Sequence, residues 1–167
     1  MLLRKTTETL VVSRLDVALR PDGGAIVVWY EVDTDRDGWL PTRLWMGELP
    51  RDGTCLVGVQ RLADGADDLA VCDFGVFLGV RGDGVVLWQG RSSSAGRFDQ
   101  GTTEELIALR LLGDGQRLPR ETVAVIEGDD SFTRGLEAVV DHRGNITVTY
   151  SAGHGRLPQH LCAVRFE

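Results

Sequence analysis

The apolar residues of this chain fall into short runs that are broken by glycine and aspartate. Three of the runs follow one plan: an apolar stretch, a polar turn that contains glycine, and a second apolar stretch that ends in an aromatic residue. They cover Leu15–Trp29, Phe77–Trp88 and Leu136–Tyr150. Short runs rich in β-branched and aromatic residues, bounded by Gly and Asp, are typical of β-hairpins. The pattern therefore predicts an all-β chain.

The hairpins return with a nearly constant period. Trp29, Trp88 and Tyr150 are 59 and 62 positions apart, and a period that returns twice indicates a repeat architecture. Each unit also has a candidate third strand, and the first two have a candidate fourth strand. These further strands are expected at 42–49, 105–112 and 160–166, and at 54–62 and 121–127.

Two segments compete as helices, at 63–73 and 103–112. The first is short and contains Gly65. The apolar positions of the second do not distinguish a period of two from a period of 3.6. Its place in the repeat favours a strand.

We expect one all-β repeat domain over residues 1–167, with units at about 15–62, 75–127 and 136–167. The third unit has no fourth strand of its own, and the β-rich run at 7–14 has no partner in its own unit. Completing the last unit with the N-terminal strand is a closure scheme of β-propellers. The sequence thus predicts a propeller-like fold with three four-stranded blades, and a β-sandwich or barrel is the alternative.

A short motif supports the same architecture. Residues 141–150 read Asp-His-Arg-Gly-Asn-Ile-Thr-Val-Thr-Tyr, and residues 22–29 carry a looser version. This hairpin resembles the Asp-x-x-Gly-Asn-x-x-Val-x-Trp repeat of bacterial β-propellers. The resemblance implies an architecture and no single activity, because propellers host lectins, hydrolases, lyases and scaffolds.

The number of blades bears on assembly. Propellers typically have about four to eight blades, so three blades per chain suggest a homodimer with six. The strand at 7–14 would then complete the partner's last blade and bury exposed strand edges.

Charge and composition exclude several classes of partner and of location. The chain has 18 basic and 25 acidic residues, a net charge of −7, which argues against a nucleic-acid partner. No apolar run approaches the ~18–20 residues of a membrane span. The three cysteines form no Cys-x-x-Cys pair, which favours a reducing compartment. We expect a protein of the bacterial cytoplasm with no membrane partner.

An alternating row of carboxylates matches the first half of a calcium loop. The carboxylate expected at position twelve is replaced by Leu44, and Glu31 or Glu48 would have to substitute for it. The alternative is an acidic, solvated hairpin loop. Calcium is the one cofactor that the sequence suggests, and its candidate ligands are Asp33, Asp35 and Asp37.

In a propeller, the loops that join strands two to three and four to one lie on the same face. This face is expected to be acid-rich and to carry one aromatic platform, which suits a small polar or cationic molecule, a glycan or a peptide. The candidate ligand-binding residues on it are Trp39, Arg91, Arg97, His154 and Arg156.

Catalytic signals are weak. The sequence has no Gly-x-Ser-x-Gly nucleophile elbow. Four residues are candidates for acid–base work in a central pocket: Asp16, Arg81, Asp141 and His142. The sequence favours a ligand-binding or scaffolding module. The alternative is a small bacterial enzyme of secondary metabolism, a cyclase, lyase or hydrolase.

Overall fold

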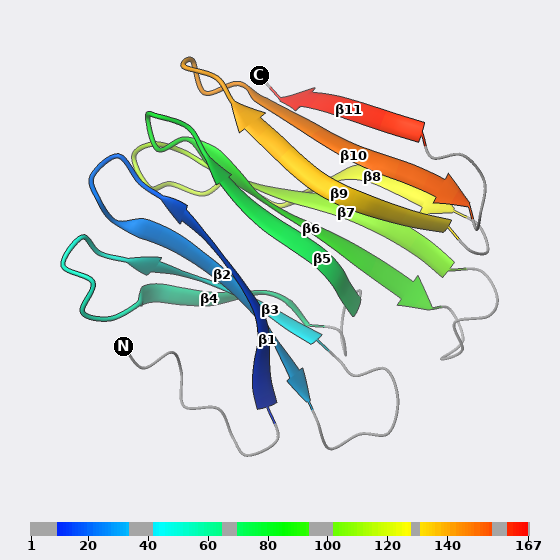
Figure 1. The fold of residues 1–167 in the computed structure, drawn as a ribbon, viewed down its shortest axis with the longest axis horizontal. Helices are drawn as coiled ribbons and strands as arrows, with labels where there is room; N and C mark the ends of the chain where they lie inside the picture. The colour runs from blue at the N-terminus through cyan, green and yellow to red at the C-terminus, as the bar shows by residue number, and fades with distance from the viewer. Residues whose placement is uncertain are drawn as a thin grey trace. The chain divides into compact units, whose positions relative to one another are not determined.

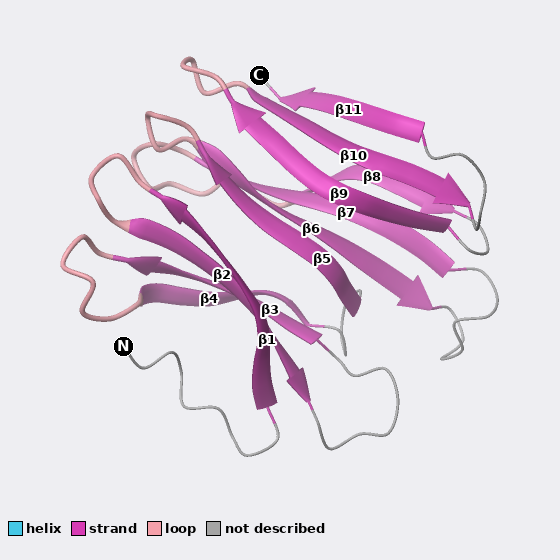
Figure 2. Cartoon of the chain, in the orientation of Figure 1, coloured by secondary structure: helices cyan, strands magenta, loops and turns pink. Residues whose placement is uncertain are grey.

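The computed structural model of the chain describes residues 10–33, 42–64, 70–93, 102–127, 131–154 and 160–166. Within these ranges the chain forms eleven β-strands and no helix (Figures 1 and 2). The predicted all-β class is confirmed. Among the same residues there is no helix of the length and hydropathy that a membrane span requires.

The chain divides into two compact units, Met1–Val71 and Cys72–Glu167. The N-terminal unit contains a single four-stranded sheet of β1 (Leu10–Leu19), β2 (Ala25–Asp33), β3 (Thr42–Leu49) and β4 (Val57–Asp64). The remaining strands form a four-stranded and a three-stranded sheet. They are β5 (Ala70–Leu78), β6 (Gly84–Ser93), β7 (Thr102–Leu111) and β8 (Glu121–Glu127), and β9 (Ser131–Val140), β10 (Ile146–His154) and β11 (His160–Phe166).

In every sheet the spatial order of the strands follows their order in the chain (Figure 1). The first strands of the three sheets begin at Leu10, Ala70 and Ser131, so the predicted period of about 60 residues is confirmed. Each first strand begins five residues earlier than the sequence suggested. Repeated antiparallel meanders of this kind are consistent with a propeller-like fold.

The separate N-terminal strand predicted at 7–14 is wrong where the structure describes it. Residues 10–14 are the first half of β1 and pair with β2, Leu10 opposite Asp33 and Arg14 opposite Tyr30. The register shifts between Val12 and Arg14, so a bulge absorbs one residue. This bulge breaks the apolar alternation, and the sequence therefore reads as two runs. Residues 10–14 cannot complete another blade, and residues 7–9 lie outside the described ranges.

One turn geometry closes four hairpins, at Arg20–Gly24, Gly79–Asp83, Leu112–Gln116 and Asp141–Asn145. In each, the first N–H donates to the fifth carbonyl and the fourth N–H donates to the first carbonyl. The fourth residue is a glycine with φ between 85° and 88°. This is a type I turn followed by a left-handed glycine bulge, a conformation that favours glycine.

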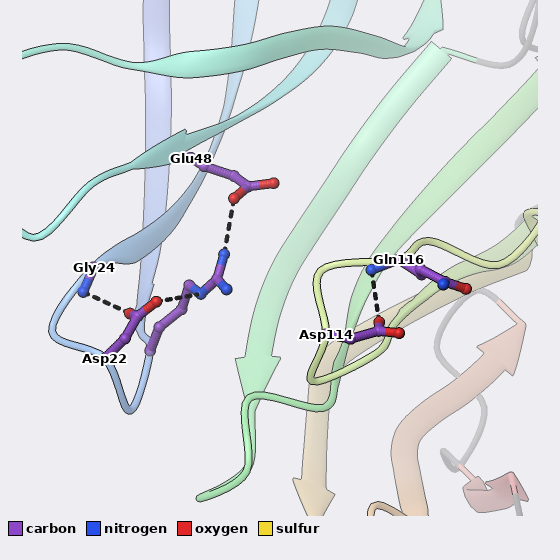
Figure 3. A network of polar contacts seen from close by, with 6 residues as sticks. Asp22, Gly24, Glu48, Asp114 and Gln116 are labelled. Carbon is purple, nitrogen blue, oxygen red and sulfur yellow. Dashed lines mark hydrogen bonds and ion pairs between the residues drawn. The ribbon is translucent and has the colours of Figure 1, made fainter.

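Aspartate side chains reinforce these turns. In the first turn Asp22 Oδ1 accepts from the Gly24 N–H at 2.9 Å, and in the third Asp114 Oδ1 accepts from the Gln116 N–H at 2.9 Å (Figure 3). The Asp-Gly spacing that the sequence repeats thus has a local hydrogen-bonding cause.

Each sheet has two distinct faces. We call the face that carries Trp29, Trp88 or Tyr150 the aromatic face, and the other the opposite face. In the C-terminal unit, the aromatic face of β9–β11 packs on the opposite face of β5–β8. The shared core consists of Val85, Leu87, Leu106, Ala108, Leu136, Ile146, Val148 and Tyr150.

Two turn glycines with the same conformation have different surroundings. A Cβ added at Gly144 would lie 3.1 Å from Asp83 Oδ2, whereas one at Gly115 would meet nothing within 4 Å. Gly115→Ala should lower the free energy of unfolding by about 1–2 kcal/mol through left-handed strain. Gly144→Ala should lower it further, because Asp83 is held by the Gly113 N–H at 2.8 Å. Urea unfolding measures both, and equal losses would contradict the contribution of Asp83.

Candidate functional site

Polar side chains gather where β2 ends, β3 begins and β4 ends, which we call the loop end of the N-terminal sheet. Glu31 is the register partner of Arg43, and Arg43 is the register partner of Asp64. Directly paired residues of antiparallel strands point to the same side, so all three lie on the aromatic face. Glu31 and Asp64 are 0% and 5% exposed. Two carboxylates are therefore buried on either side of one arginine.

The Glu31 carboxylate is held by a tryptophan. Its Oε2 accepts from Trp45 Nε1 at 3.0 Å. The Trp45 ring stacks on Trp29, with ring centroids 6.5 Å apart and planes at 15°. In the described part of the chain the buried Nε1 of Trp29 has no acceptor. The stacked rings form a rigid support beside the carboxylate.

Asp64 anchors two guanidinium groups. Its Oδ2 accepts from Arg61 Nη1 and lies 3.6 Å from Arg43 Nε. The Arg43 and Arg61 side chains are 36% and 48% exposed, whereas that of Asp64 is 7% exposed. The arginines therefore face solvent with the carboxylate beneath them. Guanidinium groups fixed in this way present several N–H donors in a defined orientation.

A second buried polar pair lies in the C-terminal unit. Gln89 Nε2 donates to Glu104 Oε2 at 2.7 Å, and both residues are buried. Glu104 is the register partner of Arg91. The backbone therefore places one predicted ligand-binding residue, Arg91, directly across from a buried carboxylate.

Much of the predicted binding face lies outside the described residues. Asp33 and His154 each end a strand, β2 and β10, and their backbones pair with Leu10 and Ser131. Nothing is described of their side chains or of that of Arg91. Within the described ranges, no group of three or more His, Cys, Asp or Glu could hold a metal. The following predicted residues lie outside those ranges: Asp35, Asp37, Trp39, Arg97 and Arg156.

The two carboxylates considered as substitute calcium ligands have other roles. Glu48 lies at the opposite end of the sheet from Asp33, where its Oε2 is 2.8 Å from Arg20 Nη1 (Figure 3). Glu31 is two residues from Asp33, but its carboxylate is buried and bonded to Trp45. Calcium binding at Asp33, Asp35 and Asp37 stays a prediction.

The four acid–base candidates lie in three different elements, because Asp141 and His142 share one turn. Asp16 is in β1, where its Oδ1 accepts from the next backbone N–H at 2.9 Å. Arg81 is in the β5–β6 turn, with its Nε 3.8 Å from Asp83 Oδ2. Asp141 and His142 begin the β9–β10 turn.

Asp141 has a structural role in its turn. Its carboxylate accepts from the N–H groups of Arg143 and Asn145 at 2.8 and 3.0 Å, and from Asn145 Nδ2 at 2.8 Å. The Asn145 side chain, with help from both backbone N–H groups, lowers the pKa of Asp141 to about 2. The group is therefore ionised at neutral pH and has no proton to donate.

Sequence reasoning did not select Arg43 or Trp45 as site residues, and it placed Asp64 only beside the expected binding face. Charged residues beside predicted loops resemble ordinary solvated strand ends. The available signal was alternation: Glu31 follows Trp29 by two positions, so it belongs on the side of the strand that buries Trp29. Which charges then meet depends on register, which a single sequence does not provide.

The Glu31–Trp45 hydrogen bond should be measurable as a coupling energy. A double-mutant cycle of Trp45→Phe with Glu31→Gln should give about 1 kcal/mol or more, because the two groups are in direct contact. A control cycle of Trp45→Phe with Glu48→Gln should give less than about 0.5 kcal/mol, since Glu48 lies on the other face of β3 and its carboxylate is bonded to Arg20. Chemical denaturation measures both, and equal couplings would contradict the assigned bond.

The depressed pKa of Asp141 predicts a pH-dependent contribution to stability. The contribution is complete above the ordinary value of 3.8 and is lost as the pH falls toward about 2. Titration of the side-chain carboxyl carbon by NMR should give a midpoint near 2 in the folded protein. Asn145→Ala should move this midpoint upward, because it removes the largest cause. An unchanged midpoint in that variant would contradict the assignment.

Comparison with known proteins gives limited information. No known protein family matches the sequence, and no curated protein matches it either. Among solved structures, the chain is similar to an endo-arabinase from Bacteroides thetaiotaomicron VPI-5482, with 11% sequence identity and a TM-score of 0.48. The match covers 90% of this chain and 54% of that one, so the chain spans about half the length of the structure it matches. The likeness assigns no activity to this chain.

Proposed function

We propose that the chain is a ligand-binding module that recognises an oxygen-rich polar ligand, a glycan, at the loop end of its N-terminal sheet. The observation that carries this proposal is the pair of partly exposed guanidinium groups, Arg43 and Arg61, anchored by the buried carboxylate of Asp64. Anchored arginines offer oriented donors to hydroxyl and carboxylate oxygens.

The neighbouring chain segment supports the same choice. Residues 34–41 join β2 to β3 and include Trp39, which the sequence selects as an aromatic platform. An aromatic side chain suits the apolar face of a sugar ring, and oriented N–H donors suit its hydroxyl groups. Placing the binding groups on rigid strands next to a connecting segment is common in binding proteins.

The catalytic alternative has less support. Of the described carboxylates at the loop end, Glu31 accepts from Trp45, and Asp64 accepts from Arg61. A catalytic acid needs a proton near neutral pH, and Asp141, the acid–base candidate with a resolved pKa shift, has its pKa lowered to about 2. A binding role requires no proton transfer from Glu31 or Asp64, whose carboxylates accept hydrogen bonds from Trp45 and Arg61.

Glycan-array screening followed by calorimetry tests the proposal. Arg61→Met should weaken binding of a captured glycan about tenfold, which corresponds to ~1.4 kcal/mol, with the unfolding transition of the apo protein retained. Arg51→Met, a change at an exposed arginine of the same unit outside the loop end, should bind as the parent does.

Two outcomes would overturn the proposal. One is the absence of glycan binding together with binding of a peptide or a small cation that Arg61→Met does not affect. The other is turnover of a captured ligand that is abolished by Asp141→Asn or His142→Ala, which would favour the enzyme.

A further inference from the structure

Exposed apolar side chains lie on the aromatic face of the N-terminal sheet. Leu15, Val17 and Leu19 of β1 are register partners of Trp29, Val27 and Ala25, so they share that face. Their exposed fractions are 42%, 45% and 77%. The three β2 partners are buried. The edge strand β1 therefore exposes apolar side chains to solvent next to the buried side chains of β2.

The other edge strand adds to the same patch. Val59 of β4 is 44% exposed. A Cβ added at Gly47 would lie 3.2 Å from Val59 Cγ2, and Gly47 is the register partner of Val27. Val59 therefore lies on the aromatic face as well. Apolar surface that extends across a sheet in this way marks an interaction site more often than scattered single residues do.

The C-terminal unit shows what covers an aromatic face in this repeat. The aromatic face of β9–β11, with Ile146, Val148 and Tyr150, packs on Val85 and Leu87 of the preceding sheet. Leu87 is adjacent in sequence to Trp88, so it lies on the opposite face of its sheet. The repeat thus pairs an aromatic face with the opposite face of another sheet.

The opposite face of β9–β11 carries exposed apolar residues too. Val139 and Leu161 are 71% and 82% exposed. Thr147 is the register partner of both Val139 and Arg165, and Ser151 is the register partner of Leu161. These residues therefore lie on the face away from Tyr150. The surface combines small, β-branched and charged side chains, and protein interfaces are commonly no more apolar than this.

We propose that the part of the aromatic face of β1–β4 that carries Val17, Leu19 and Val59, away from the loop end, binds the opposite face of β9–β11 in a second copy of this chain. The two faces are of the kinds that pack together within the C-terminal unit, and each carries large apolar residues that are more than 40% exposed. Two such contacts related by a two-fold axis close a dimer. Like the homodimer that the sequence suggests, this proposed assembly joins two copies, but through paired sheet faces in place of an exchanged N-terminal strand.

Light scattering on the purified chain tests the contact. At about 0.1 mM the mass should be twice 18.3 kDa. Val59→Glu and Leu161→Arg should each reduce it to that of one chain, with far-ultraviolet circular dichroism unchanged. Val80→Glu is the matched control, because Val80 is 77% exposed in the β5–β6 turn, and it should keep the parent mass.

Mixing the two monomeric variants separates a lost contact from a damaged fold. In the mixture, the wild-type aromatic face of the Leu161→Arg chain meets the wild-type opposite face of the Val59→Glu chain, and the other contact joins Glu to Arg. The mixture should therefore recover the dimer mass. A parent chain that is monomeric at 0.1 mM, variants that keep the parent mass, or a mixture that stays monomeric would each overturn the proposal.

Discussion

Eight buried side chains join the two sheets of the C-terminal unit, four from β6 and β7 and four from β9 and β10. Burying each of the larger ones contributes about 1.5–3 kcal/mol, and alternation along the strands assigns them to one face of each sheet. The contact fixes the order in which faces meet: Tyr150 lies on the covered side of its sheet, and Leu87, next to Trp88, lies on the covering side. In the N-terminal sheet the repeat places Trp29 where Tyr150 stands, so its aromatic face corresponds to the covered face of β9–β11.

The two ends of the N-terminal sheet differ in chemistry for a physical reason. At the end that carries the β1–β2 turn, Gly23 adopts φ 87° and the Asp22 carboxylate accepts from the Gly24 N–H, so the polar groups of the turn are hydrogen-bonded within the turn. At the loop end, Glu31 and Asp64 are buried and depend on donors from neighbouring strands. A buried carboxylate without such donors would be costly. The strands thus fix the charged groups before any ligand arrives, which is the property a binding site needs.

The sequence predicted what local chemistry determines and missed what register determines. Gly-Asp turns and alternating apolar runs located β3, β8 and β11 with the bounds observed, and the place of 103–112 in the repeat correctly identified it as a strand. Residues 10–14 were misassigned because the bulge between Val12 and Arg14 interrupts alternation without ending the strand. The grouping of Glu31, Arg43 and Asp64 required cross-strand pairing. The sequence suggested Asp141 as an acid–base candidate. In the structure its carboxylate accepts three hydrogen bonds from Arg143 and Asn145, which stabilise the turn.

The central claim is that one pairing of sheet faces operates both within the chain and between its copies. An isotope-filtered nuclear Overhauser experiment on an equal mixture of ¹³C-labelled and unlabelled chains detects methyl contacts between different molecules alone. The account predicts cross-peaks that join the methyl groups of Val17 and Val59 to those of Val139 and Leu161. A spectrum without intermolecular cross-peaks, or with cross-peaks confined to other surfaces, would contradict it.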